Sequence, residues 1–270
     1  MKLSLSAEMR EGIQQGLLAG AALLVLTMPP PRIGLGPAAP LHAVQPAGPS
    51  EAVANVPVAI ERKLDLAGER TSADVRTVGQ WVVDSADNGN RSFVILDKKQ
   101  ARVYLFGPGG KLRATAPVLL GYAVGDDSVA GIGERAIAEV RPSERTTPAG
   151  RFLAEPGRNA RNEDVVWVDY DAAVSMHRVI TSNPAEHRLE RLSAPEASAR
   201  RISYGCINLP VAFFENVIWP AFREGGGLVY VLPEVKTLAA VFPQLAHPGV
   251  RPPAGADGIG RTGIAISAGA

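Results

Sequence analysis

The chain contains one cysteine, Cys206, which follows a glycine in the segment Ser203 to Asn208. A free cysteine is among the most buried residue types, so composition alone favours a small buried side chain. Gly205 favours the other interpretation, because a residue without Cβ permits a strained turn and the close approach of a substrate. A thiolate in such a turn is a strong nucleophile, and nearby N–H groups could stabilise the oxyanion of an acyl-transfer intermediate. We therefore predict that Cys206 is a nucleophile.

A helix is expected directly after this cysteine. Asn208 can cap a helix whose first turn holds Pro210, where the missing N–H of proline does no harm. Apolar residues then recur at helical spacing from Val211 to Ala221. The positive end of that helix would favour the thiolate and lower its pKa from about 8.5.

A cysteine nucleophile also needs a general base, and the chain has four histidines. His42 and His247 lie near the Gly- and Pro-rich ends, so His177 and His187 are the candidates. His177 follows a strand pattern that would hold it rigidly, whereas His187 lies among charged residues. We predict His177 as the base, although by itself it could equally be a half-buried strand histidine.

Several short strands must position these residues. Strands are expected where β-branched and aromatic residues alternate between turn signals, and the long loop at 121–146 is of the kind that often carries function. A short helix is expected near residues 73–83, and a charged lid or helix at 183–201. The expected strands are 93–96, 101–106, 112–120, a strand entered at 147–152, 165–170, 174–179 and 228–232. This pattern predicts a mainly β fold with one helix after the cysteine.

The chain divides into four expected parts: a signal peptide or N-terminal anchor at 1–28, a flexible linker at 29–75, a catalytic domain at 76–235 and a Gly/Pro/Ala-rich tail at 236–270. The apolar run of the first part is too short for an ordinary membrane-spanning helix, which needs about 20 residues. It suits a secretory signal, so we expect export to the periplasm or cell envelope. An uncleaved membrane anchor or an amphipathic helix on a cytosolic protein stays open.

Charge and composition exclude several function classes. Twenty-eight basic residues against 27 acidic ones leave a net charge of +1, and no basic run suits a nucleic acid. No His and Cys residues cluster with metal-ligand spacing, so neither a metal nor an organic cofactor is expected. A lone cysteine in an exported chain has no intrachain disulfide partner.

The motif from Ser203 to Asn208, preceded by His177, resembles the signature of the L,D-transpeptidase catalytic domain, which acts in bacterial cell-wall biogenesis and cell shape. Its family pattern is an upstream His, then Ser or Thr, His, Gly, Cys, an apolar residue and Asn or Arg. Thr147-Pro148-Ala149-Gly150-Arg151-Phe152 is similar to the family's Thr-Pro-x-Gly-x-Phe segment. The resemblance covers about residues 90–235 and implies that domain's β-sandwich or barrel.

The resemblance implies a role for each matching residue. Cys206 would attack a peptidoglycan stem peptide while His177 takes the thiol proton, and the acyl group would pass to a second stem or to an acceptor protein. Carbapenem-type inhibitors would acylate the same thiol. Gly205 and Cys206 would supply oxyanion N–H groups, and the Arg178 carbonyl would orient His177. Ser203 would help to shape the turn.

Two departures from the family pattern concern the substrate side. Tyr204 stands where the family usually has His, and we expect Tyr204 and Asn208 to contact or guide the substrate. Ser203 lies 26 positions after His177, which is longer than the usual interval. An insertion is therefore expected within residues 183–201.

Other interpretations remain. A carboxypeptidase or hydrolase of the same fold would share the first chemical step, and a non-catalytic cell-wall-binding module would keep Cys206 merely buried. A papain-like protease is disfavoured, because its Cys precedes its His in the chain.

Overall fold

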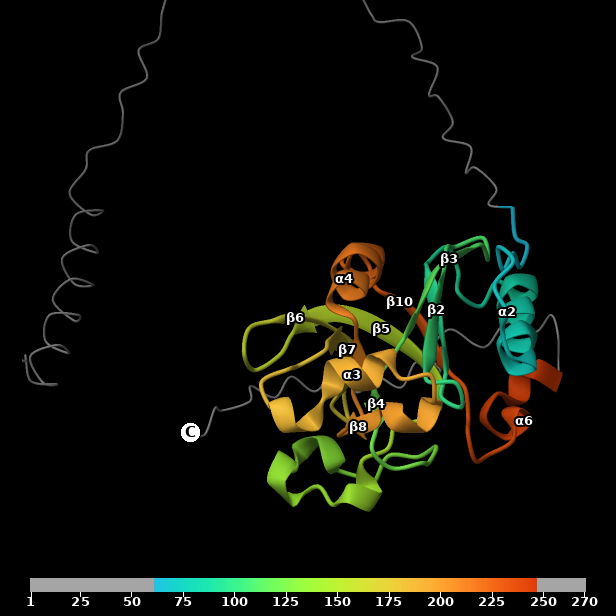
Figure 1. Cartoon of the computed structure of the whole chain (residues 1–270). Coiled ribbons are helices and arrows are strands. Elements are labelled where there is room, and N and C mark those ends of the chain that lie inside the picture. The colour runs from blue at the N-terminus through green and yellow to red at the C-terminus, as the bar shows by residue number, and fades with distance from the viewer. Residues whose placement is uncertain (1–60, 247–270) are drawn as a thin grey trace, which may run out of the picture. The chain divides into compact units, whose positions relative to one another are not determined.

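The computed structural model describes residues 61–246, and a mixed sheet of eight strands forms its centre (Figure 1). The strand order is β3-β2-β1-β10-β5-β6-β7-β9. Only two neighbouring pairs, β1–β10 and β7–β9, are parallel. The strands are β1 (Phe93–Asp97), β2 (Arg102–Phe106), β3 (Leu112–Pro117), β4 (Leu120–Gly121), β5 (Gly150–Arg158), β6 (Asp164–Asp169), β7 (Val174–Arg178), β8 (Arg201–Ser203), β9 (Ile207–Leu209) and β10 (Gly227–Val231).

The sheet is nearly closed into a barrel. Leu119, which follows β3, forms an antiparallel bridge with Asn208 of β9, so the two ends of the strand order meet. The neighbouring strand β4 pairs in parallel with β8, directly before the cysteine. The strand expected over 112–120 is thus two strands, since the chain turns at residues 118–119 to reach β9. The mainly β, barrel-like fold class is confirmed, with helical elements packed around it.

Two apolar clusters cover the two faces of the sheet. One fills the barrel interior and includes Val94, Val166 and Met176. The other lies under α2 (Ala73–Ser85), whose side chains Val78 and Val82 pack among the strand side chains of the opposite face. This separation follows from the period-2 alternation of side chains along each strand.

Helical turns follow β9. They comprise α4 (Val211–Phe213), a π-helical turn (Phe214–Ile218) and α5 (Trp219–Phe222). Pro220 lies in the first turn of α5 and has no N–H to donate. The π-helical turn before it changes the hydrogen-bond pattern there, and the helical path continues to Phe222.

The folded domain is wider than the expected residues 76–235. The Lys63 N–H donates to the Gly109 carbonyl at 2.9 Å, and Asp65 bridges Lys111. At the other end, Phe242 follows α6 (Leu238–Val241) and is fully buried. Residues 61–75 and 236–246 therefore pack onto the domain, which corrects that part of the expected linker and tail. The rest of both, with the expected signal or anchor at 1–28, lies outside the described residues.

The loop expected at 121–146 and the helical segment expected at 183–201 are both present. The loop at 121–146 contains three 3-10 turns, Ile132–Glu134, Ile137–Glu139 and Pro142–Glu144. The segment at 183–201 is ordered by α3 (Arg188–Ser193) between two further 3-10 turns. Among residues 61–246, no helix is long and apolar enough to span a bilayer.

Candidate active site

Cys206 lies between β8 and β9, in a turn formed by residues 203–206 that we call the Cys turn. Its side chain is half-buried, and its sulfur lies 3.4 Å from the Ala173 carbonyl oxygen. Ser175 Oγ lies 3.8 Å from the sulfur. Strand β9 runs parallel to β7 with His177 opposite Asn208, which brings the histidine beside the cysteine. The two residues predicted as base and nucleophile are thus brought together.

The ring of His177 has a defined orientation. Its Nδ1 lies 2.7 Å from the Arg178 carbonyl oxygen, which can only accept a hydrogen bond. The Nδ1 atom therefore carries a proton, and Nε2 of the neutral ring is free to accept the thiol proton of Cys206. This is the contact expected of the Arg178 carbonyl.

His177 and Cys206 shift each other's pKa. Burial by itself would raise the pKa of the Cys206 thiol, but the hydrogen bond and charge of His177, together with hydrogen bonds from Ser175, lower it below its ordinary value. Burial would likewise lower the pKa of His177, yet its contacts with Cys206 and the Arg178 carbonyl raise it. Each residue therefore favours the charged form of the other.

The expected helix after Cys206 is wrong in its position. Residues 207–209 are strand β9, and α4 begins only at Val211 with Pro210 as its N-cap. Asn208 cannot cap a helix, because its backbone N–H and carbonyl both pair with Leu119 at 2.9 Å. The lowered thiol pKa consequently comes from His177 and Ser175 and not from a helix dipole.

Gly205 gives the Cys turn its shape. Its φ angle is +132°, and a Cβ placed there would lie 2.8 Å from the Thr146 carbonyl oxygen. The Gly205 N–H donates to Ser203 Oγ at 3.2 Å, and that hydroxyl donates to the Cys206 carbonyl at 2.6 Å. The Gly205 N–H is therefore already used within the turn, which corrects its expected oxyanion role. The Cys206 N–H remains the candidate oxyanion donor.

Asn208 is positioned differently from the substrate contact that we expected. It is 1% exposed, and its Nδ2 donates to the Cys206 carbonyl at 3.2 Å. Its Oδ1 accepts from Arg188 Nη1 at 2.7 Å. Asn208 thus links α3 to the Cys turn from within the protein, where a bound substrate would not touch it.

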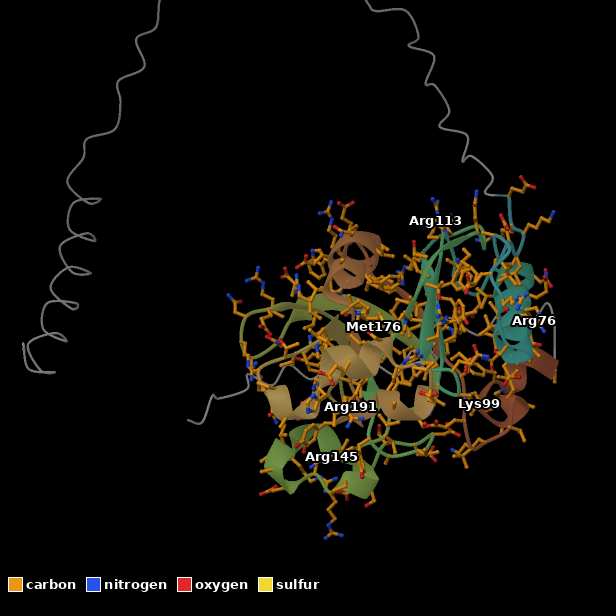
Figure 2. The ribbon with its side chains drawn as sticks, in the orientation of Figure 1. Arg76, Lys99, Arg113, Arg145, Met176 and Arg191 are labelled. Carbon is orange, nitrogen blue, oxygen red and sulfur yellow. The ribbon has the colours of Figure 1, made fainter. Side chains whose placement is uncertain are left out.

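Tyr204 lies at the rim of the site and is 38% exposed. The guanidinium of Arg145, which is labelled in Figure 2, lies 3.9 Å from the centre of the Tyr204 ring. This is cation–π geometry. The position of Tyr204 is compatible with the expected substrate contact.

The segment at 183–201 supplies one residue to the site. Arg188 bonds Asn208, and its charge opposes protonation of His177. His187 instead lies on the surface of this segment, where it pairs with Glu190 at 3.0 Å. Sequence patterns did not identify Arg188, because its partner Asn208 lies 20 residues away in β9, whereas Arg188 begins α3.

Two further site residues were also missed. Ser175 lies two positions before His177, so strand alternation places both side chains on one face and could have identified it. Thr147 belongs to the Thr-Pro-x-Gly-x-Phe segment, and its hydroxyl donates to the Gly205 carbonyl at 2.8 Å. Among residues 61–246, no group of three potential ligands could hold a metal ion.

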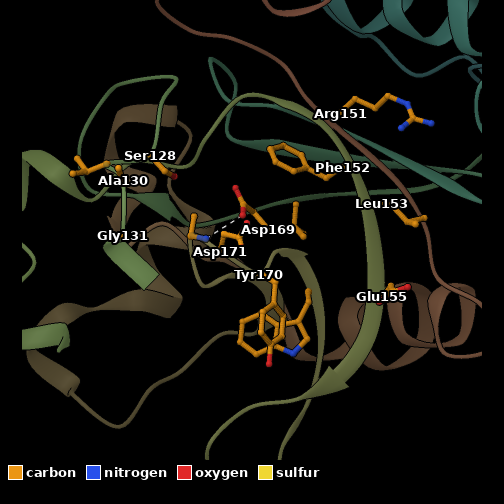
Figure 3. A pocket seen from close by; sticks show the side chains of 14 residues that line it. Ser128, Ala130, Gly131, Arg151, Phe152, Leu153, Glu155, Asp169, Tyr170 and Asp171 are labelled. Atoms are coloured by element: carbon orange, nitrogen blue, oxygen red, sulfur yellow. Dashed lines mark hydrogen bonds between the residues drawn. The ribbon is translucent and has the colours of Figure 1, made fainter. Parts of the chain in front are cut away.

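A pocket of about 450 Å³ lies near the site (Figure 3). Its wall combines the loop at 128–131, parts of β5 and β6, and the turn at 170–172. Trp167 and Tyr170 form a tilted aromatic pair there, with ring centres 5.0 Å apart. Its lining ends at Ala172, next to Ala173, whose carbonyl oxygen lies 3.4 Å from the Cys206 sulfur, but neither Cys206 nor His177 lines the pocket.

Comparisons with known proteins show structural similarity to L,D-transpeptidase catalytic domains. The catalytic domain of an E. faecium L,D-transpeptidase matches at 14% identity and a TM-score of 0.31, over 53% of this chain and 98% of that one. The L,D-transpeptidase LdtMt1 in complex with imipenem matches at 18% identity and a TM-score of 0.32, over 52% and 58%. The helical cell shape determining protein Pgp2 from Campylobacter jejuni matches at 15% identity and a TM-score of 0.35, over 61% and 57%.

The chain spans less than two thirds of the last two proteins. No protein-family profile matches the chain, and no curated protein matches it either. The geometry around Cys206 is therefore the observation that bears on function.

Proposed function

We propose that this protein is a cysteine-dependent L,D-transpeptidase that acts on peptidoglycan stem peptides through a thioester acyl-enzyme. One observation carries the proposal: His177 is fixed by the Arg178 carbonyl beside a Cys206 thiol whose pKa is lowered. An oriented base next to an activated thiol is the arrangement that nucleophilic acyl transfer requires. The substrate class comes from the resemblance of the Cys motif and the Thr-Pro-x-Gly-x-Phe segment to that family.

The first half-reaction would form the acyl-enzyme. The proton of the Cys206 thiol passes to His177 Nε2, and the sulfur attacks the carbonyl carbon of the bond that precedes a D-amino acid. The Cys206 N–H stabilises the oxyanion. As the tetrahedral intermediate collapses, the C–N bond breaks and protonated His177 gives its proton to the leaving amine. A thioester on Cys206 and a free D-amino acid result.

The second half-reaction would regenerate the thiol. An amine of a second stem peptide, or of an acceptor protein, attacks the thioester carbonyl and gives up a proton through His177. The C–S bond breaks, and the sulfur regains a proton. If water attacks in place of the amine, the product is a free carboxylate and the reaction is a carboxypeptidase reaction.

The proposal also implies a cellular location and a class of inhibitor. The protein would be exported and would act in the periplasm or cell envelope, where peptidoglycan is built. Carbapenems would acylate Cys206 as substrate mimics. Neither a metal nor an organic cofactor is required, because the thiolate, the imidazole and the backbone N–H perform each step of the scheme.

Incubation of the purified protein with disaccharide-tetrapeptides, followed by mass spectrometry, tests the proposal. The expected result is cross-linked dimers with release of the terminal D-amino acid, and the Cys206→Ala variant as control forms none. Trimmed monomers alone would show a carboxypeptidase instead. Unchanged substrate would favour a cell-wall-binding module.

A further inference from the structure

Three consecutive residues lie against the back of the Cys turn. The guanidinium of Arg145 covers the ring of Tyr204 at 3.9 Å. A Cβ on Gly205 would lie only 2.8 Å from the Thr146 carbonyl oxygen, so this carbonyl approaches Gly205 closely. The Thr147 hydroxyl donates to the Gly205 carbonyl at 2.8 Å. Residues 145–147 therefore pack against the Cys turn at Tyr204 and Gly205.

Thr147 is held firmly on both sides. It is fully buried, and its hydroxyl accepts a hydrogen bond from the Gly121 N–H at 2.9 Å while donating to Gly205. Its carbonyl accepts from Lys98 Nζ at 2.8 Å. That ammonium is in turn paired with Asp126 at 2.7 Å, and the Lys98 side chain has no exposed surface. The direction of the Thr147 hydroxyl is thus fixed by the surrounding structure.

The Gly205 carbonyl and the Cys206 N–H belong to one peptide unit. That unit is planar, with the oxygen and the hydrogen on opposite sides of the C–N bond. A hydrogen bond that fixes the oxygen therefore fixes the direction of the N–H. Donation to the oxygen also polarises the peptide, which strengthens the N–H as a donor.

We infer that Thr147 is a positioning residue that aims the Cys206 N–H at the oxyanion of the acyl-transfer intermediate. The inference rests on the proposed role of Cys206 as nucleophile. It goes beyond that role because it assigns the orientation of the oxyanion donor to a buried side chain that the substrate does not touch.

Two reagents that react with the same thiol separate this role from general damage to the fold. Acylation by p-nitrophenyl acetate passes through a tetrahedral oxyanion and releases nitrophenolate, whereas alkylation by iodoacetamide is a direct displacement without an oxyanion. The Thr147→Val variant keeps the shape of the side chain but loses the donor. We expect its acylation rate to fall by about 10- to 100-fold, which is less than the roughly 100- to 1,000-fold for outright removal of an oxyanion donor, because the Cys206 N–H is kept and only its direction is no longer fixed. Alkylation should change less than about twofold.

The Thr147→Ser variant keeps the hydroxyl and should recover acylation to within about threefold of the wild-type rate, because the hydrogen bond to Gly205 is retained. Val103→Ala, in the barrel interior, lowers stability away from the turn and should leave the ratio of acylation to alkylation unchanged. If the valine variant does not fold, Thr147→Ala is measured with the same expected ratio.

Equal loss of both rates in the Thr147 variants, or no loss of acylation, overturns the inference. Both reagents need only a reactive thiol, so this result does not depend on the stem-peptide substrate. Failure of the wild type to process disaccharide-tetrapeptides would count against the proposed function alone.

Discussion

At the scale of single residues, the proposed chemistry depends on the way in which Cys206 and His177 shift each other's pKa. His177 lowers the pKa of the Cys206 thiol, and Cys206 in turn raises the pKa of His177. The Arg178 carbonyl fixes which nitrogen faces the sulfur. The rate of Cys206 alkylation, which depends on the thiolate, should therefore vary with pH according to the coupled titration of Cys206 and His177.

Replacing His177 by Ala should move the pH dependence of Cys206 alkylation upward. In the wild type, the rate should fall only when the pH drops below the lowered pKa of the thiol. Without His177, burial is left as the main influence on the pKa of the thiol, and the midpoint should rise above that of the wild type. Iodoacetamide alkylation measured from acid to alkaline pH checks this, and an unchanged midpoint in His177→Ala would move the base elsewhere.

Local patterns predicted the chemistry at this scale because the motif residues are close in sequence. Cys206, Gly205 and Ser203 form one turn, and the Arg178 carbonyl is adjacent to His177. Thr147 could not be assigned its contact, since its hydroxyl reaches Gly205 across 58 positions of sequence. No local spacing encodes such a pairing.

At the scale of elements, the parallel pairing of β7 and β9 brings base and nucleophile together. The sequence favoured a helix from Asn208, because a capping residue before a proline is a helix start signal. Pairing with Leu119 and β7 overrides that signal and draws residues 207–209 into the sheet. The central strands were predictable from alternation, whereas this short strand depends on long-range partners.

The segment containing α3 should influence the site through Arg188. Arg188→Ala removes the hydrogen bond to Asn208 and a charge that lowers the pKa of His177. We expect acylation about tenfold slower, as for loss of one charge-assisted hydrogen bond. The alkaline limb of the pH profile should move to higher pH. His187→Ala is the matched control, and equal effects of both variants would exclude a specific role for Arg188.

At the scale of the whole molecule, a buried charge network joins distant parts of the chain. Lys98, at the end of β1, contacts Asp126 on the 121–146 loop and Glu234 after β10. Asp126 also accepts from the backbone N–H groups of residues 234, 235 and 236. Arg201, at the start of β8, pairs with Glu234. The network holds the loop and the Thr147 segment against the barrel.

Lys98→Met should destabilise the protein by about 3–5 kcal/mol, because it leaves buried carboxylates without their cation. Lys99→Met is the matched control: this neighbouring lysine is exposed (Figure 2) and pairs with Asp74 at 3.4 Å, so its loss should cost less than about 1 kcal/mol. Urea unfolding measures both values. Equal costs would show that the network does not hold the domain.

The same network predicts how stability depends on acid. Burial would raise the pKa of Asp126, but the backbone N–H groups and Lys98 hold it below its ordinary value. A depressed folded pKa contributes stability above the unfolded pKa of about 3.9, and this stability is lost as the pH falls toward the folded value. In Lys98→Met the pKa of Asp126 should rise, so acid unfolding should begin at higher pH than in the wild type.

Intact-mass spectrometry after incubation with a carbapenem tests whether Cys206 is the acylated nucleophile. We expect one covalent adduct on the wild type, mapped to Cys206 by peptide digestion, and none on Cys206→Ala. Adduct formation should be strongly slowed in His177→Ala. A wild-type protein that stays unmodified, or an adduct that persists in Cys206→Ala, would show that Cys206 is not this nucleophile.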